Sequence, residues 1–184
     1  MTSTSIRRKR ATMSDVPQRV TALEAAAAID KVKMRHAAAV DAFLNGEASL
    51  EPVLAEISPE YRFGSTVLEA CTGADAYRDF LTQYAQRVDF SLQFLTGSVT
   101  GVDVQQGHAV GDWVVWHPFA LEGAPWIMAG RSHDEFEQRG ERWLLTATSL
   151  AVEVIAPWST GWGQDRISPQ WQGKQPSTIS EGGK

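Results

Sequence analysis

Four runs of strand-forming residues fill most of the second half of the chain, and they constrain the fold more than any other feature. The runs lie at about 90–104, 108–121, 126–138 and 142–156. Short breaks that contain a glycine separate them: Gln106-Gly107, Glu122-Gly123 and Arg139-Gly140. Breaks of this length fit hairpins, so the runs predict an antiparallel meander.

Three helices are predicted before the meander. Thr21 and Glu24 form a capping-box pattern that predicts the start of the first helix, and Asn45-Gly46 predicts its end. The other two helices are predicted at 50–57, with Ser49 as its cap and a stop at Ser58-Pro59, and at 72–88. Helices followed by an antiparallel meander are typical of an α+β domain.

The chain of 184 residues is long enough for one domain, which we place at residues 21–157. Residues 1–20 carry a basic run with no apolar segment after it, and they predict a disordered head rather than a secretion signal. Residues 158–184 are rich in Gly, Ser, Pro and Gln and predict an irregular tail. Three tryptophans in that tail predict that part of it packs on the domain: Trp158, Trp162 and Trp171.

Composition argues against several classes of partner. Residues 1–12 hold four basic residues, so the formal net charge of −5 divides into +4 there and −9 for the rest. An acidic body argues against nucleic acid as a partner. No apolar run is long enough to span a membrane. The single cysteine, Cys71, excludes an internal disulfide, and a cytoplasmic location is expected.

One histidine stands inside an apolar strand run, in the stretch VVWHPFAL at 114–121. Because side chains alternate along a strand, His117 shares a face with Trp113, Val115 and Phe119. This face is the more apolar one and is expected to point inward. His117 is therefore either a buried imidazole bonded to a polar partner or an acid/base group that a carboxylate orients.

The other histidines and the remaining motifs are weaker candidates. His36 belongs to the apolar stripe of the first helix, while His108 and His133 are expected to be exposed. The chain has no HxH or HExxH spacing, so no metal site is predicted. It also lacks a GxSxG elbow and a Gly-rich phosphate loop.

Two local patterns resemble SnoaL-like proteins of the nuclear-transport-factor-two-like superfamily, in particular the branch with scytalone dehydratase and hexachlorocyclohexane dehydrochlorinase. The first is Ile29-Asp-Lys-Val…Ala39-Val-Asp41 on the first helix. The second is the hairpin Gly130-Arg-Ser-His-Asp-Glu-Phe-Glu-Gln-Arg-Gly-Glu-Arg-Trp143. The resemblance covers about residues 22–160 and is more specific for the fold than for the reaction.

The resemblance implies a cone-shaped α+β barrel, with a curved antiparallel sheet wrapped around the N-terminal helices and an apolar cavity for a small hydrophobic molecule. In that branch an Asp–His dyad removes a proton without a cofactor. The aspartate corresponds to Asp41, but the position of the dyad histidine holds Gln93. The expected cavity-lining residues are Phe63, Gln93, Trp113, Val115, Phe119 and Met128.

Two functions follow from this departure. In the favoured hypothesis the chain is a lyase, isomerase or cyclase in which Asp41 orients His117 as a relocated base, with Gln93 as a polar contact to the substrate. In the alternative the cone binds a hydrophobic ligand or serves as an accessory subunit. An Asp41 carboxylate within ~3.2 Å of a His117 nitrogen would favour the enzyme. A separation above ~6 Å, with Asp41 bonded only to backbone, would favour the binding module. A homo-oligomer formed through the outer sheet face, where Trp116 lies, is expected in either case.

Overall fold

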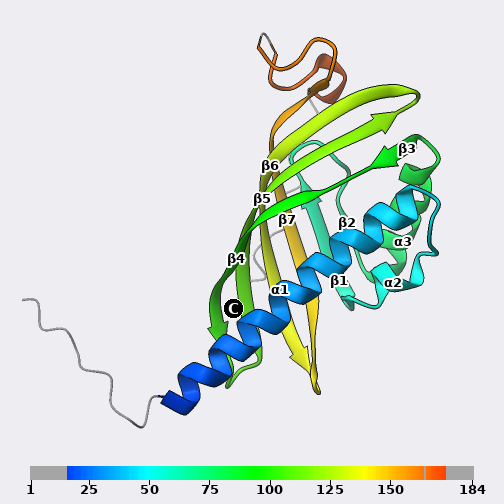
Figure 1. Ribbon diagram of the computed structural model, residues 1–184. Helices are drawn as coiled ribbons and strands as arrows, with labels where there is room; N and C mark the ends of the chain where they lie inside the picture. Colours follow the sequence, from blue (N-terminus) through cyan, green and yellow to red (C-terminus); the bar gives the residue numbers. More distant parts are fainter. Residues whose placement is uncertain (1–15, 164, 173–184) are drawn as a thin grey trace, which may run out of the picture.

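The computed structural model describes residues 16–163 and 165–172 of the chain. These residues form three helices and seven strands, followed by a short 3-10 turn at Pro169–Trp171 (Figure 1). The helices are α1 (Val16–Leu44), α2 (Glu51–Leu54) and α3 (Ala74–Ala85). The strands are β1 (Ile57–Ser65), β2 (Cys71–Thr72), β3 (Val88–Ser91), β4 (Phe94–Asp103), β5 (His108–Leu121), β6 (Ala124–Arg139) and β7 (Arg142–Pro157).

All described strands belong to one strongly curved sheet, and α1 runs across its concave face (Figure 1). The strand order is β2-β1-β7-β6-β5-β3, and β4 pairs with β5 as well. The short helices α2 and α3 lie at the end of the sheet where α1 finishes (Figure 1). The architecture is the predicted α+β cone, and the three predicted hairpin breaks are confirmed.

The first helix begins earlier than its sequence pattern indicates. It starts at Val16, within the predicted disordered head, and residues 1–15 lie outside the described part of the chain. The Thr21 hydroxyl donates to the carbonyl of Pro17 instead of capping a helix end (3.0 Å). The reason is that Pro17 is well suited to the first turn of a helix, so the helix continues upstream of the capping box.

The prediction for residues 50–60 was wrong in part. The second helix ends at Leu54, Ser49 is not its cap, and Ser58-Pro59 lies within β1 rather than terminating a helix. The pairing register of β1 with β7 shifts between Ile57 and Arg62, the segment that contains Pro59. A proline lacks the N–H that a sheet ladder requires, so the ladder is irregular there.

The sheet also contains a parallel pair, which the meander pattern did not predict. Strand β1 runs parallel to β7, with Phe63 beside Thr148 and Ser65 beside Leu150. This pairing places the last strand in the middle of the sheet, between β1 and β6. The rest of the described sheet is antiparallel.

The predicted strand at 90–104 is divided into β3 and β4. Both parts pair with β5, with Ser91 opposite Phe119 and Phe94 opposite Trp116. The interruption at Leu92 and Gln93 therefore lies opposite His117 and Pro118. The Leu92 N–H still donates to the Pro118 carbonyl (3.2 Å), but Pro118 has no N–H to donate in return, so the ladder is incomplete at this point. The interruption frees the backbone of Gln93 for another partner.

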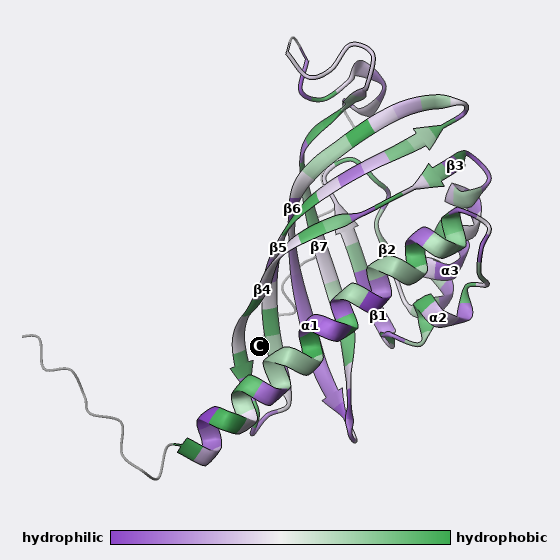
Figure 2. Ribbon diagram, in the orientation of Figure 1, coloured by the Kyte–Doolittle hydropathy of each residue, from purple (hydrophilic) through white to green (hydrophobic). Residues whose placement is uncertain are grey.

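Burial alternates residue by residue along β5, and Figure 2 shows apolar and polar residues interleaved on the strands. The concave face carries Trp113, Val115, His117 and Phe119, so the inward orientation predicted for His117 is confirmed. On the outer face, Trp116 makes an edge-on ring contact with Trp162 of the C-terminal segment (5.8 Å). Among the described helices, none has the length and apolarity that crossing a membrane requires.

Candidate functional site

The site is centred on Asp41, which lies one turn before the end of α1 and is buried against β3. Its carboxylate accepts three hydrogen bonds. The backbone N–H of Gln93 donates to Oδ2 (2.7 Å), and the Gln93 side-chain amide donates to Oδ1 (3.2 Å). The Ser91 hydroxyl also donates to Oδ1 (2.7 Å). Three donors on one carboxylate hold Asp41 in a single orientation.

Ser91 connects Asp41 to His117. The Ser91 Oγ lies 2.7 Å from Asp41 Oδ1 and 2.9 Å from His117 Nε2. Asp41 and His117 are therefore joined by a hydroxyl rather than by the direct bond that a dyad would have. This geometry lies between a direct Asp41–His117 bond, which would favour an enzyme, and a wide separation of the two side chains, which would favour a binding module. The carboxylate has side-chain partners, and one of them leads to the imidazole.

Asn45, which follows α1, holds the backbone of Ser91. Its side-chain amide donates to the Ser91 carbonyl (3.1 Å), and its Oδ1 accepts from the Ser91 N–H (2.7 Å). The Asn45-Gly46 helix stop thus has a second effect, because the asparagine that ends α1 also binds β3. Ser91 itself is fully buried, so these bonds replace all contact with water.

His117 is a buried imidazole with one free nitrogen. Its side chain is 5% exposed, and its Nδ1 has no hydrogen-bond partner among the described residues. Burial lowers the pKa of His117 from 6.5 to about 4, although the nearby Asp41 charge acts in the opposite direction. The imidazole is therefore neutral at pH 7 and can accept a proton. The Phe119 ring lies 5.1 Å from it.

The residues predicted to line a cavity gather on the concave face. Gln93 is partly exposed. The five apolar residues are buried and belong to one core cluster: Phe63, Trp113, Val115, Phe119 and Met128. Met128 is the register partner of His117 on β6, so an apolar wall surrounds the imidazole. The backbone N–H and the side-chain amide of Gln93 both bind Asp41, and its contact with a substrate stays a prediction.

Ser91 was missed at the sequence level, although a signal was present. In a strand that contains Gln93, period two places Ser91 on the same face as Gln93. A small polar residue on that face is a candidate partner for an inward histidine. Its contact with α1 depends on how the helix packs across the sheet, which no local pattern specifies.

A second buried polar cluster lies further toward the N-terminus of α1. Lys33 Nζ forms an ion pair with Asp134 Oδ2 (2.6 Å) and donates to Ser132 Oγ (3.2 Å). Ser132 in turn donates to Asp134 Oδ1 (2.8 Å), and the Lys33 ammonium lies 5.3 Å from the centre of the Trp113 ring. Strand parity could have indicated that Ser132 and Asp134 point inward, since both share a face with Phe136.

The remaining histidines do not join either cluster by a hydrogen bond. His36 is buried beside Tyr77 (6.0 Å between rings), and burial lowers its pKa to about 3. His133 is exposed and lies 2.7 Å from Asp112 on the outer face. His108 is exposed, as predicted. In the part of the chain that the structure describes, no group of histidine, cysteine and acidic residues could hold a metal ion.

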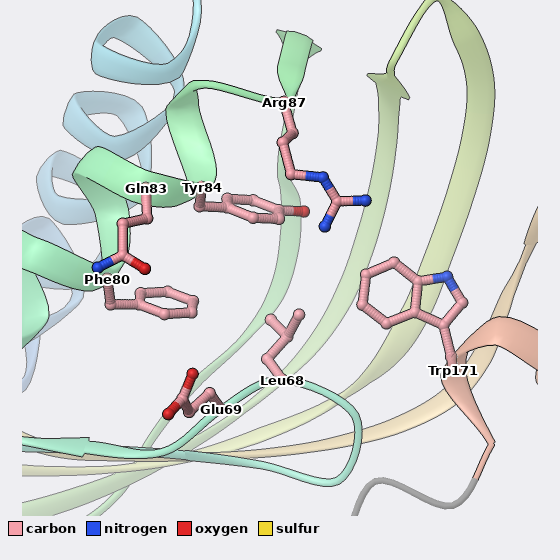
Figure 3. Close-up of a pocket in the computed structure, with 7 residues that line it drawn as sticks. All are labelled: Leu68, Glu69, Phe80, Gln83, Tyr84, Arg87 and Trp171. Carbon is pink, nitrogen blue, oxygen red and sulfur yellow. The ribbon is translucent and has the colours of Figure 1, made fainter.

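A pocket of about 190 Å³ lies between α3, the segment after β1 and the C-terminal segment (Figure 3). The parallel rings of Phe80 and Tyr84 form one side of it, and Leu68 and the buried Trp171 form the other (Figure 3). Arg87 reaches over the pocket beside Tyr84 (Figure 3). The residues that line this pocket are distinct from Asp41, Ser91 and His117.

The arrangement can support proton transfer by a neutral imidazole. The carboxylate and the hydroxyl fix the ring, and an imidazolium formed on it would be stabilised by the Asp41 charge. The apolar surroundings keep competing water away from the free nitrogen.

Comparison with solved structures shows the same fold in proteins of low sequence identity. A hexachlorocyclohexane dehydrochlorinase from Novosphingobium barchaimii LL02 is 14% identical, with a TM-score of 0.62 over 78% of this chain and 93% of that one. A candidate scytalone dehydratase from Novosphingobium aromaticivorans DSM 12444 is 16% identical, with a TM-score of 0.63 over 79% and 92%. An NTF2-like protein of unknown function from Pseudomonas putida KT2440 is 13% identical, with a TM-score of 0.56 over 70% and 87%.

No protein-family model and no curated protein matches the sequence. At identities this low the structural likeness establishes the fold.

Proposed function

We propose that this chain, which has the cone fold of the nuclear-transport-factor-two-like superfamily, is an acid/base enzyme that acts on a small hydrophobic molecule without a cofactor. His117 is the base, and Asp41 is the carboxylate that orients it. The reaction that fits best is an elimination, with isomerisation or cyclisation as related uses of the same base. The observation that carries the proposal is the buried chain of hydrogen bonds from Asp41 through Ser91 to His117.

Two further features support a base at this position. Burial lowers the pKa of His117 to about 4, so the imidazole is unprotonated at neutral pH, and the Asp41 charge, which raises that pKa, offsets part of the loss of basicity. The concave face around it is apolar, which suits a substrate of the kind named in two of the similar structures. Hexachlorocyclohexane and scytalone both lose a proton together with a leaving group, chloride or water.

The test uses these two compounds as probes. Chloride release from hexachlorocyclohexane and water loss from scytalone are measured with the wild-type chain and with His117→Ala. A positioned base contributes ~10²–10⁴-fold to the rate, so His117→Ala is expected to lower kcat by at least about 100-fold. His108→Ala is the matched control, because that histidine is exposed and its loss should leave the rate unchanged. Equal rates in wild type and His117→Ala would contradict the proposal.

A ligand-binding function without chemistry is the second candidate, and the pocket of Figure 3 favours it. That pocket opens to solvent, whereas His117 is buried. Absence of turnover with both probes, combined with binding of the dye 1-anilinonaphthalene-8-sulfonate that Phe80→Ala abolishes, would support the binding function over the enzyme.

A further inference from the structure

We infer that Ser91 is the positioning residue that selects the tautomer of His117. In that tautomer Nδ1 is the atom that accepts the proton, and the proton comes from a carbon atom of the substrate. The inference rests on the proposed function for its catalytic meaning, but the tautomer is a property of the resting protein. It can therefore be tested without a substrate.

The protons available along the hydrogen bonds from Asp41 to His117 fix the tautomer. A serine hydroxyl has one proton, and at Ser91 that proton is donated to Asp41 Oδ1. The Ser91 Oγ can then only accept at its second contact, so His117 Nε2 must carry a hydrogen and donate it (2.9 Å). A neutral imidazole carries one N–H, which leaves Nδ1 with a free lone pair.

The other ring nitrogen of His117 agrees with this assignment. His117 Nδ1 is buried and has no partner among the described residues, as expected for a nitrogen that carries a free lone pair and no hydrogen. A buried Nδ1–H without an acceptor would lose its hydration with nothing in exchange, and would also leave Ser91 Oγ without the donor it faces. The tautomer with hydrogen on Nε2 satisfies more of the buried groups.

The surroundings of Asp41 hold the Ser91 hydroxyl in place. Gln93 fills the other positions of the carboxylate with two N–H donors, and Asn45 holds the Ser91 backbone at both its N–H and its carbonyl. These bonds fix the Ser91 backbone and the Asp41 carboxylate, so the Ser91 hydroxyl is held against Asp41 Oδ1. The interruption of the strand at Leu92 and Gln93 is what brings these donors to Asp41.

The direction of the free lone pair restricts the substrate. Nδ1 lies on the side of the ring away from Ser91, and the neighbours of the ring on the concave face are Val115, Phe119 and Met128. A hydroxyl or ammonium proton would have to lose its hydration to enter such surroundings, which is costly. A carbon-bound hydrogen has no such cost, so the substrate presents an activated C–H to Nδ1.

In the reaction that follows, the C–H bond breaks and its proton binds Nδ1. The electron pair of the broken C–H bond forms the new carbon–carbon double bond, and the leaving group departs with the electron pair of its own bond to carbon. The resulting imidazolium donates at Nε2 to Ser91, whose hydroxyl still donates to Asp41. The charge is therefore stabilised through the hydroxyl, and no proton needs to move along the chain.

The test is nitrogen NMR of the full chain labelled with ¹⁵N-histidine at neutral pH. The chain has four histidines, and the His117 signals are assigned as those absent from His117→Gln. We expect a pyrrole-type Nε2 whose proton exchanges slowly with solvent, and a pyridine-type Nδ1. In Ser91→Ala the Nε2 proton should exchange faster, and the signals should move toward an average of the two tautomers.

Two variants serve as controls. Ser58→Ala removes an equally buried serine hydroxyl from β1, away from the imidazole, and should leave the His117 signals unchanged. Ser91→Thr retains the hydroxyl and should keep the wild-type tautomer. A wild-type Nδ1–H, or a Ser91→Ala spectrum identical to that of the wild type, would overturn the inference. If Ser91→Ala does not fold, the wild-type and Ser91→Thr spectra decide the question.

The outcome is separable from that of the proposed function. The expected spectra with no turnover of either probe would leave the role of Ser91 in fixing the tautomer intact and would count against the enzyme. Turnover that depends on His117, with Nδ1 protonated in the resting protein, would support the enzyme and overturn the role of Ser91.

Discussion

Asp41, Ser91 and His117 show how far single residues could be predicted. Strand periodicity was enough to place His117 on the concave face, and the resemblance of the first helix identified Asp41, which is buried in α1. The link between Asp41 and His117 through Ser91 could not be predicted, because Ser91 reaches both only after α1 packs against the sheet. The same packing explains why Gln93 binds Asp41.

Burial of His117 and His36 should make stability depend on pH. Their pKa values are lowered from 6.5 to about 4 and about 3 in the folded chain, mainly by burial. Below pH ~6.5 the unfolded chain therefore binds protons that the folded chain does not, and the free energy of unfolding falls as the pH falls. The loss due to His117 should level off near pH 4 and be on the order of 3 kcal/mol.

Urea unfolding between pH 4 and 8 measures this effect. His117→Gln should show a shallower fall in stability over the same range than the wild type, whereas His108→Ala should reproduce the wild-type curve. A wild-type stability that does not change between pH 7 and pH 4.5 would contradict the lowered pKa of both buried histidines.

Loss of the Asn45 side chain should destabilise β3 at Ser91, although the hydrogen bonds of that side chain go to the Ser91 backbone rather than to Asp41 or His117. Asn45→Ala removes two hydrogen bonds from the buried backbone of Ser91 and leaves both of its groups without partners. We expect a loss of about 1–3 kcal/mol in the free energy of unfolding, measured in urea. A loss as small as that caused by a substitution at the exposed Gln105 would contradict this account.

At the scale of helices and strands, local sequence signals predicted the turns between neighbouring strands. The three hairpins joining β4 to β7 follow from short glycine-containing breaks, and Glu122 and Gly123 both adopt the positive φ that a two-residue turn requires (52° and 78°). The parallel pairing of β1 with β7 joins segments far apart in the sequence, so no local pattern could indicate it.

The Lys33–Asp134 ion pair ties α1 to β6 inside the cone, and its loss should be costly. Asp134 is 0% exposed, so Asp134→Asn leaves the Lys33 ammonium buried without its counter-charge. Breaking a buried pair costs about 3–5 kcal/mol, which thermal or urea unfolding would measure. The double variant Lys33→Met with Asp134→Leu should recover most of that loss. A double variant less stable than Asp134→Asn would show that the pair is not the cause.

The bulge between β6 and β7 requires a glycine at position 130. The register shifts between Ala129 and Gly130, and a Cβ on Gly130 would overlap the carbonyl oxygen of Ala151 across the ladder. Gly130→Ala should therefore destabilise the chain by about 1–3 kcal/mol, because the ladder must distort to accept the methyl group. Gly163→Ala, which meets no atom within 4 Å, is the control and should have no comparable effect.

At the scale of the whole molecule, the C-terminal segment belongs to the folded unit. An isolated bridge joins Ile167 to Ile155 of β7, and Trp171 is buried against the pocket of Figure 3. Trp171→Ala should lower the free energy of unfolding by about 3–5 kcal/mol, since it leaves a large cavity. Trp158→Ala, at a side chain that is 57% exposed, should cost far less in the same urea experiment. Equal losses would mean that burial of Trp171 contributes nothing.

The parallel pairing of β1 with β7 also has a consequence for synthesis on the ribosome. Strand β1 emerges early, but its partner β7 is made only after β3 to β6. The growing chain must therefore keep β1 unpaired on one side through most of translation, with an open sheet edge exposed to other chains. Completion of the sheet is a late event, and chains that terminate before residue 142 should aggregate rather than fold.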